Sequence, residues 1–143
     1  MASAGALTVV SQLFRRWTDR QSELDWGISG PRLHVLTLLA HAGPQTMGAL
    51  ASTLHVTPRA VTRLVDGLET QGYATRTPHP TDRRSIRVAC TPTGAKIVAE
   101  FLPNHFAKVN QLLQGISPER LRTFLEVTTE SGDRIGEELW PKE

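Results

Sequence analysis

Residues 45–73 read QTMGALASTLHVTPRAVTRLVDGLETQGY, and this stretch decides the fold. Thr46 is placed to cap a short helix, and Thr57 is placed to cap a second helix whose first position is Pro58. Only His55 and Val56 separate the two helices. Two short helices joined by so brief a turn predict a helix-turn-helix.

The second of these helices has one apolar side and one polar side. Its apolar residues recur at i, i+3, i+4 and i+7, which predicts a buried stripe: Val61, Leu64, Val65 and Leu68. Recognition helices meet base edges in the major groove with their first turns. The candidate DNA contacts of the motif are therefore Thr46, Thr57, Arg59, Ala60, Thr62 and Arg63. The alternative is that this polar side is only the solvent side of an amphipathic helix.

A β-hairpin is predicted directly after the second helix, which Gly72 ends. Its strands are residues 73–77 and 85–90, and in the second strand Ile86, Val88 and Cys90 alternate with polar or small residues, as expected for one buried face. The tip, HPTDRRS (residues 79–85), carries turn-forming residues. A hairpin in this position is a wing, and arginines at its tip can enter a minor groove. We expect Arg83 and Arg84 to do so, with the Asp82 carboxylate holding one of these two guanidinium groups.

Residues 68–94, LETQGYATRTPHPTDRRSIRVACTPTG, resemble the signature of the MarR family of bacterial winged-helix regulators. That signature combines a helix-ending Leu and Gly, an Arg on the first strand, Asp-x-Arg at the wing and Thr-x-x-Gly before the next helix. Here its members are Leu68, Gly72, Arg76, Asp82 with Arg84, and Thr91 with Gly94. Ala74 and Cys90 are smaller than the aliphatic residues usual there. The resemblance adds Arg76 and Asp82 to the candidate DNA-binding residues.

Four further helices complete a mainly α fold with a small β-hairpin wing. The first is expected from Leu7 to near Gly27, and the second from a cap at Ser29 to Gly43-Pro44. A long helix should begin at Thr91-Pro92, break or kink near Pro103 and finish at Gly115, and a last helix should begin at Ser117-Pro118. We expect one domain over residues 1–143, with a DNA reader at about 30–95 and dimerisation helices at about 5–27 and 92–141.

The long helices carry apolar faces that need a partner. A symmetric homodimer supplies one, and the resemblance implies that N- and C-terminal helices of two subunits interleave. Two recognition helices would then lie about one helical turn apart on an inverted repeat of double-stranded DNA. The alternative is a monomer with a self-contained helical core.

Charge is unevenly distributed along the chain. The formal net charge is only +2, but residues 57–96 carry +4 and residues 97–143 carry −3. This asymmetry is typical of a chain in which one part faces a polyanion. The single cysteine suits a reducing compartment, and no apolar run suggests a membrane span or signal peptide, so we expect a cytoplasmic protein.

The resemblance also implies an effector, a small aromatic or amphipathic molecule bound between the dimer helices and the reader. The candidate residues for this site are Arg16, Trp17, Trp26, His34 and Phe106, each of which is otherwise a core or surface residue. Cys90 is interpreted as a packing thiol, with redox sensing as the alternative. The five histidines lack the spacing of metal ligands, so no metal and no cofactor are predicted.

These patterns together predict a sequence-specific DNA-binding transcriptional regulator. We expect a repressor that binds a palindromic operator as a homodimer and is released by a small ligand. The alternative is a winged-helix module that binds only proteins. An enzyme is not expected, because the sequence has no glycine-rich phosphate loop, no Gly-x-Ser-x-Gly elbow and no paired carboxylates in an apolar run.

Overall fold

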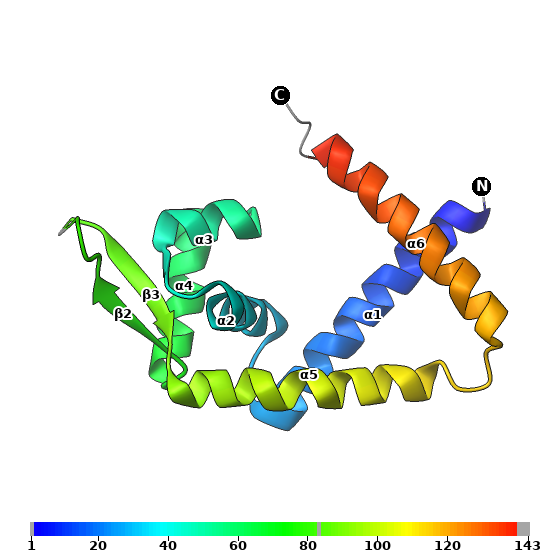
Figure 1. The fold of residues 1–143 in the computed structure, drawn as a ribbon, viewed down its shortest axis with the longest axis horizontal. Coiled ribbons are helices and arrows are strands. Elements are labelled where there is room, and N and C mark those ends of the chain that lie inside the picture. Colours follow the sequence, from blue (N-terminus) through cyan, green and yellow to red (C-terminus); the bar gives the residue numbers. More distant parts are fainter. Residues whose placement is uncertain (1, 83, 140–143) are drawn as a thin grey trace. The chain divides into compact units, whose positions relative to one another are not determined.

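The fold was obtained as a computed structural model that describes residues 2–82 and 84–139. The elements in chain order are α1 (Ala2–Trp26), α2 (Gly30–Ala42), β1 (Gln45–Thr46), α3 (Met47–Leu54), α4 (Pro58–Thr70), β2 (Ala74–Pro78), β3 (Ile86–Cys90), α5 (Pro92–Leu112) and α6 (Pro118–Leu139), as Figure 1 shows. The predicted fold class, mainly α with a small wing, is confirmed. The chain divides into two compact units, Met1–His105 and Phe106–Glu143, so the boundary falls inside α5.

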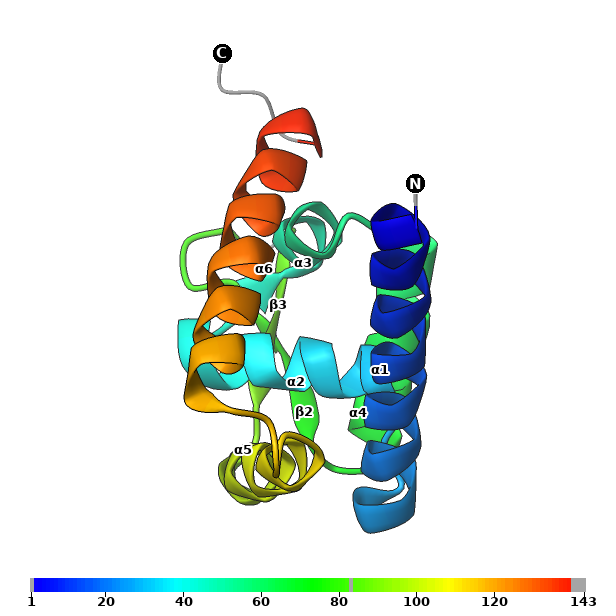
Figure 2. The same cartoon turned by 90° about the vertical axis from the view of Figure 1, so that its right-hand side faces the viewer.

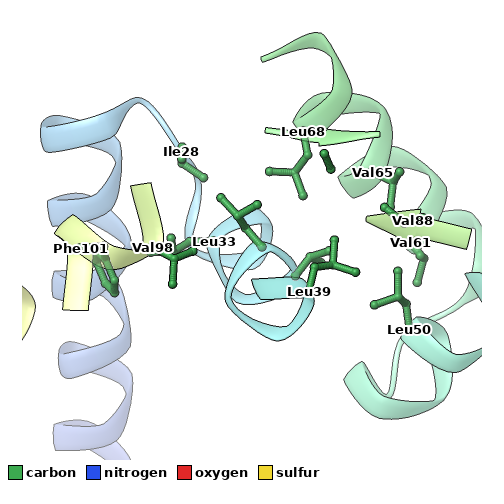
Figure 3. Close-up of a cluster of buried hydrophobic side chains, with 13 residues drawn as sticks. Ile28, Leu33, Leu39, Leu50, Val61, Val65, Leu68, Val88, Val98 and Phe101 are labelled. Carbon is green, nitrogen blue, oxygen red and sulfur yellow. The ribbon is translucent and has the colours of Figure 1, made fainter. Parts of the chain in front are cut away.

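Helix α2 is the centre of the first unit. It contacts α1, α4 and β3. In Figure 1 it lies between α1 and the other elements of the reader, and Figure 2 shows it crossing the direction of β2 and β3. Four of its residues are buried: Leu33, Val35, Leu36 and Leu39. They meet fully buried side chains from other elements, namely Ile28, Leu50, Val61, Val65, Leu68 and Val88 (Figure 3). Burial of these apolar side chains is what holds the reader together.

The wing belongs to a three-stranded antiparallel sheet in the order β1-β3-β2. Strands β2 and β3 pair from Ala74↔Cys90 to Pro78↔Ile86. Each strand begins one residue later than predicted. Strand β1, which was not predicted, pairs with β3 through Gln45↔Val88 and Thr46↔Arg87.

The inward face predicted for the second strand is only partly buried. Val88 is fully buried, but Ile86 is 49% exposed. Ile86 pairs with Pro78 at the far end of the hairpin, which projects away from the helices in Figure 1, so few side chains are there to cover it.

The helix starts agree with the predictions at two threonines and differ at Ser29. The Oγ1 atoms of Thr46 and Thr57 accept hydrogen bonds from the backbone N–H groups of Ala49 and Ala60, at 3.1 and 3.2 Å. Ser29 occupies the N-cap of α2 but makes no side-chain cap bond. The Asp19 carboxylate lies beside this helix start instead: its Oδ1 is 1.6 Å from where a Cβ on Gly30 would lie. The positive end of the helix dipole favours an anion there.

One predicted helix start and one predicted break are wrong. Helix α1 begins at Ala2 rather than Leu7, because its first residues are mostly alanine, which favours helix without an apolar stripe. Helix α5 runs without a break through Pro103. A proline removes one backbone hydrogen bond, and the burial of Val98 and Phe101 in the preceding turns offsets part of that loss.

The second unit contains the end of α5, a turn and α6. Gly115 in the turn has φ +83°, and the Ser117 Oγ accepts the N–H of Arg120 at 3.4 Å. Large apolar side chains of α6 are exposed in this chain: Phe124, Leu125, Val127 and Ile135. Across residues 2–82 and 84–139, no helix has both the length and the apolar content needed to cross a bilayer.

Candidate nucleic-acid interface

The joint of the helix-turn-helix is a left-handed residue. His55, directly after α3, has φ 51° and ψ 43°, and the N–H of Val56 donates to the Ala51 carbonyl at 3.1 Å. Thr57 then caps α4. The chain therefore reverses within two residues, which sets α4 against α3 and aims its N-terminus outward.

Helix α4 presents two arginines on its outer side. Val61, Val65 and Leu68 are buried against the core, while Arg59 and Arg63 are exposed on the first two turns. The two predicted neighbours differ: Thr62 is exposed, but Ala60 is half-buried. The exposed positive charge therefore lies where a recognition helix contacts base edges.

The predicted threonine contacts all have local partners. Thr46 and Thr57 are helix caps, and the Thr62 Oγ1 donates to the Pro58 carbonyl at 3.0 Å. A capping hydroxyl accepts through its oxygen and keeps its own proton. Thr46 and Thr57 can therefore still donate to a phosphate, whereas Thr62 already uses its proton inside the helix.

Arg76 connects the wing to α4. From β2, its guanidinium forms an ion pair with Asp66 at 2.7 Å and a second with Glu69, while its backbone N–H donates to Glu69 Oε1 at 2.9 Å. Burial disfavours the charged guanidinium, but the two carboxylates outweigh it and raise the pKa of Arg76. This geometry favours a role in fixing the wing on the recognition helix over the predicted direct contact with DNA.

The wing tip (residues 79–85) shows one backbone contact of Asp82. Its Oδ1 accepts the backbone N–H of Arg84 at 3.0 Å. The expected contact of Asp82 with a neighbouring guanidinium stays a prediction. A short acidic side chain commonly bonds to the backbone two residues ahead, which stabilises a turn. The side chain of Arg84 is exposed. Arg83, the other predicted tip arginine, lies outside the described residues.

The Thr-x-x-Gly segment fastens the return of the wing to the end of α4. The Thr91 Oγ1 donates to the Gly72 carbonyl at 2.7 Å and accepts the Gly94 N–H at 3.1 Å. A Cβ on Gly94 would lie 2.2 Å from the Tyr73 carbonyl oxygen. Only glycine permits this approach, so the spacing of the motif follows from the packing of α5 on the turn before β2.

Two positioning contacts were not found from the sequence. Arg87 on β3 donates to the Pro44 carbonyl at 3.1 Å, and the Gln71 Nε2 donates to the Gly27 carbonyl at 2.9 Å. Each joins residues more than 40 positions apart, at separations of 43 and 44. No pattern of neighbouring residues predicts such a contact. The only sequence signal was that Arg87 belongs to the basic block.

The candidate effector residues are only partly brought together. Trp17 and Trp26 of α1 are half-buried and belong to an aromatic cluster. The ring centroid of Trp17 lies 5.8 Å from that of His105, and the ring centroid of Trp26 lies 5.4 Å from that of Phe101. Arg16 and His34 are exposed, and Phe106, which is 60% exposed, belongs to the second unit.

The other members of this aromatic cluster were not predicted. The ring of His105 stacks on that of Phe101 with centroids 5.2 Å apart, and the centroids of Phe14 and Trp17 lie 5.7 Å apart. Phe101 and His105 are four positions apart on α5, and Phe14 and Trp17 are three apart on α1. Side chains at these spacings meet on a helix, and the sequence reasoning did not use this signal.

Cys90 is half-buried on β3. Its Sγ donates to the Thr91 carbonyl at 3.4 Å, and burial raises the pKa of the thiol. A raised pKa lowers the thiolate fraction, which fits a packing role. Among the residues that the structure describes, no group of three or more His, Cys, Asp or Glu side chains is arranged to hold a metal ion.

The short helix pair, the exposed arginines of α4 and the braced hairpin define a winged helix-turn-helix DNA-binding protein. A model of the MarR family matches residues 28–86. The chain is 30% identical over 111 residues to the HTH-type transcriptional repressor YetL of Bacillus subtilis, covering 76% of this chain and 66% of YetL. It is 32% identical over 111 residues to the uncharacterized HTH-type transcriptional regulator Mb0904 of Mycobacterium bovis, covering 73% of this chain and 78% of that protein.

The fold agrees with solved structures over nearly the whole chain. The crystal structure of Streptococcus pneumoniae FabT in complex with DNA superposes with a TM-score of 0.83 at 23% identity, covering 97% of this chain and 98% of FabT. The chain belongs to the MarR family, and it is a DNA-binding transcriptional regulator rather than an enzyme.

Proposed function

We propose that the protein is a repressor that binds an inverted-repeat operator as a homodimer. One observation carries this proposal: two sets of exposed arginines are held in a fixed relative position. Arg59 and Arg63 are exposed on α4, and Arg84 is exposed on the wing. Arg76 ties the wing to α4 through its ion pairs. Arg63 is assigned to a base edge in the major groove. Arg84 is assigned to the adjacent minor groove.

A homodimer is supported by the apolar side chains left exposed in each unit. On α1 these are Leu7, Val9, Val10, Leu13 and Phe14, and on α6 they are Phe124, Leu125, Val127 and Ile135. Monomeric proteins rarely leave so much clustered apolar surface in water. A twofold dimer would cover it and would place two recognition helices on one duplex.

Release by a small ligand is supported by the aromatic cluster between α1 and α5. A planar ligand that binds against Trp17 and His105 would release DNA only if it bound more tightly to a dimer whose recognition helices are wrongly spaced for the operator. It would then shift the conformational equilibrium towards that dimer. Benzoate serves as a test compound. We expect it to quench tryptophan fluorescence and to weaken operator binding, and Trp17→Ala to reduce both effects.

The central experiment is a mobility-shift titration of the full chain with the DNA upstream of its own gene, at several salt concentrations. Arg63→Ala should weaken binding by about 1 to 3 kcal/mol and relax base preference. Arg84→Ala should weaken binding to different sequences evenly and reduce the salt slope by about 1. Arg122→Ala, an exposed arginine on α6, is the matched control.

Two outcomes would contradict the proposal. Binding retained after removal of both Arg63 and Arg84 would overturn the assignment of the site. A wild-type chain that binds no duplex even at low salt would instead favour a winged helix that recognises proteins only.

A further inference from the structure

The wing tip contains a histidine that the proposed function leaves unused. The Nδ1 atom of His79 lies 3.3 Å from the backbone nitrogen of Thr81 and 3.2 Å from its Oγ1. A backbone N–H can only donate, so Nδ1 is the acceptor in its contact with the Thr81 nitrogen.

The remaining hydrogen bonds of the tip connect this acceptor to Arg84. The His79 N–H donates to the Ser85 carbonyl at 3.0 Å, and the Ser85 N–H donates to the Asp82 carbonyl at 3.0 Å. The Asp82 carboxylate in turn accepts the Arg84 N–H. The side chains of His79 and Asp82 therefore accept backbone N–H groups of the loop that carries the exposed arginine.

We propose that His79 is a positioning residue for DNA binding, which holds the tip in the shape that presents Arg84 to the minor groove. The proposal rests on the role of the wing in the proposed function. Without the Nδ1 acceptor the Thr81 N–H loses its hydrogen bond inside the tip, and the tip loosens. A loose tip must be ordered when DNA binds, which lowers affinity.

The first test measures the exchange of the Thr81 amide hydrogen with solvent in the free full-length protein by NMR. We expect faster exchange in His79→Ala, because the acceptor is removed, and exchange close to the wild type in His79→Asn, because Asn offers Oδ1 at the same distance along the side chain. His41→Ala, which changes an exposed histidine of α2, should leave the rate unchanged. Unchanged exchange in His79→Ala would overturn the proposal.

The second test measures affinity for the DNA upstream of the gene. His79→Ala should weaken binding about three- to tenfold, and His79→Asn should restore it to within about twofold of the wild type. Equal affinity of His79→Ala and wild type would refute the positioning role. If the wild type binds no DNA, the proposed function fails and this role falls with it, whereas the exchange rate of the Thr81 amide still decides whether His79 is the acceptor.

Discussion

Arg76 ties the wing to the recognition helix through both its side chain and its backbone. Its guanidinium and backbone N–H bond to α4, through Asp66 and Glu69, so the wing and the recognition helix keep a fixed relative position. Two readers held in register lose less entropy on binding than two that move independently. We therefore expect Arg76 to contribute to affinity through the geometry of Arg63 and Arg84.

We expect Arg76→Ala to lower both the free energy of unfolding and the affinity for DNA. Removal of the guanidinium leaves two carboxylates facing each other, at an expected loss of about 1 to 3 kcal/mol in unfolding free energy, measured by urea denaturation. Arg76→Lys should recover only part of this, since an ammonium cannot bridge two carboxylates as the planar guanidinium does. An Arg76→Ala protein as stable as the wild type would show that the bridge contributes nothing.

The Cys90 thiol should react slowly with alkylating agents. Burial raises its pKa, so at any pH below that pKa less of the reactive thiolate is present than in a free cysteine. The rate of iodoacetamide labelling, followed by mass spectrometry, should therefore lie below that of N-acetylcysteine at pH 8 and rise more steeply above it. Faster labelling than N-acetylcysteine would reopen the redox interpretation.

Residue roles were predictable where they depend on local spacing. The caps at Thr46 and Thr57 follow from a threonine directly before a helical pattern, and the structure confirms both. At Asp82 the structure shows a bond to the backbone two residues ahead, which the sequence reasoning did not predict, and the contact with a guanidinium stays a prediction. The Arg76 bridge joins β2 to α4 across ten positions, and only the fold brings its partners together.

At the scale of elements, the start of α5 depends on one glycine. We expect Gly94→Ala to destabilise the protein by about 1 to 3 kcal/mol, because the new Cβ would meet the Tyr73 carbonyl oxygen at 2.2 Å, and backbone cannot move aside as a side chain can. Gly48→Ala is the matched control in α3, where a Cβ meets nothing within 4 Å. It should raise stability by about 0.5 to 1 kcal/mol, since alanine favours helix.

Thermal denaturation followed by circular dichroism measures both glycine variants. The two substitutions add the same methyl group, so opposite signs would show that the close approach at Gly94, rather than added volume alone, sets the effect. An unchanged midpoint for Gly94→Ala would mean that α5 can shift away from the turn without loss.

Elements with strong periodicity were predictable, and short ones were not. The stripe of Val61, Leu64, Val65 and Leu68 predicted α4, and the structure buries all of these except Leu64, which is half-buried. Strand β1 has two residues, too few for any alternation to show, and it forms only because β3 offers a free edge. Helix α5 continued through Pro103 because packing of its buried residues outweighs a local helix breaker.

At the scale of the whole molecule, the sequence predicted the class of protein but not how the chain divides. The boundary after His105 falls inside a continuous helix, two residues after Pro103, and no glycine marks it. Tertiary contacts set such a boundary, since the first unit has a core around α2 and the second has α6 with much of its apolar side exposed. We expect a functional assembly of two chains because this apolar surface is exposed to solvent in the single chain, and not because of any sequence motif.

The dimer can be tested by placing a charge on that surface. Leu125 of α6 is 64% exposed, so in a monomer Leu125→Glu would change stability little. In a dimer it buries an unpaired carboxylate, which strongly disfavours association. We expect the wild type to have twice the chain mass in light scattering and Leu125→Glu to shift towards the monomer, with loss of operator binding.

Ile86→Glu is the control for this experiment, because Ile86 is an exposed apolar residue of the wing and not of the long helices. It should leave the mass of the assembly unchanged. The wild-type unfolding midpoint should also rise with protein concentration, as mass action requires when folding and association are coupled. A wild type of single-chain mass with a midpoint independent of concentration would contradict the dimer, and the spacing of two recognition helices on one duplex would then have no physical basis.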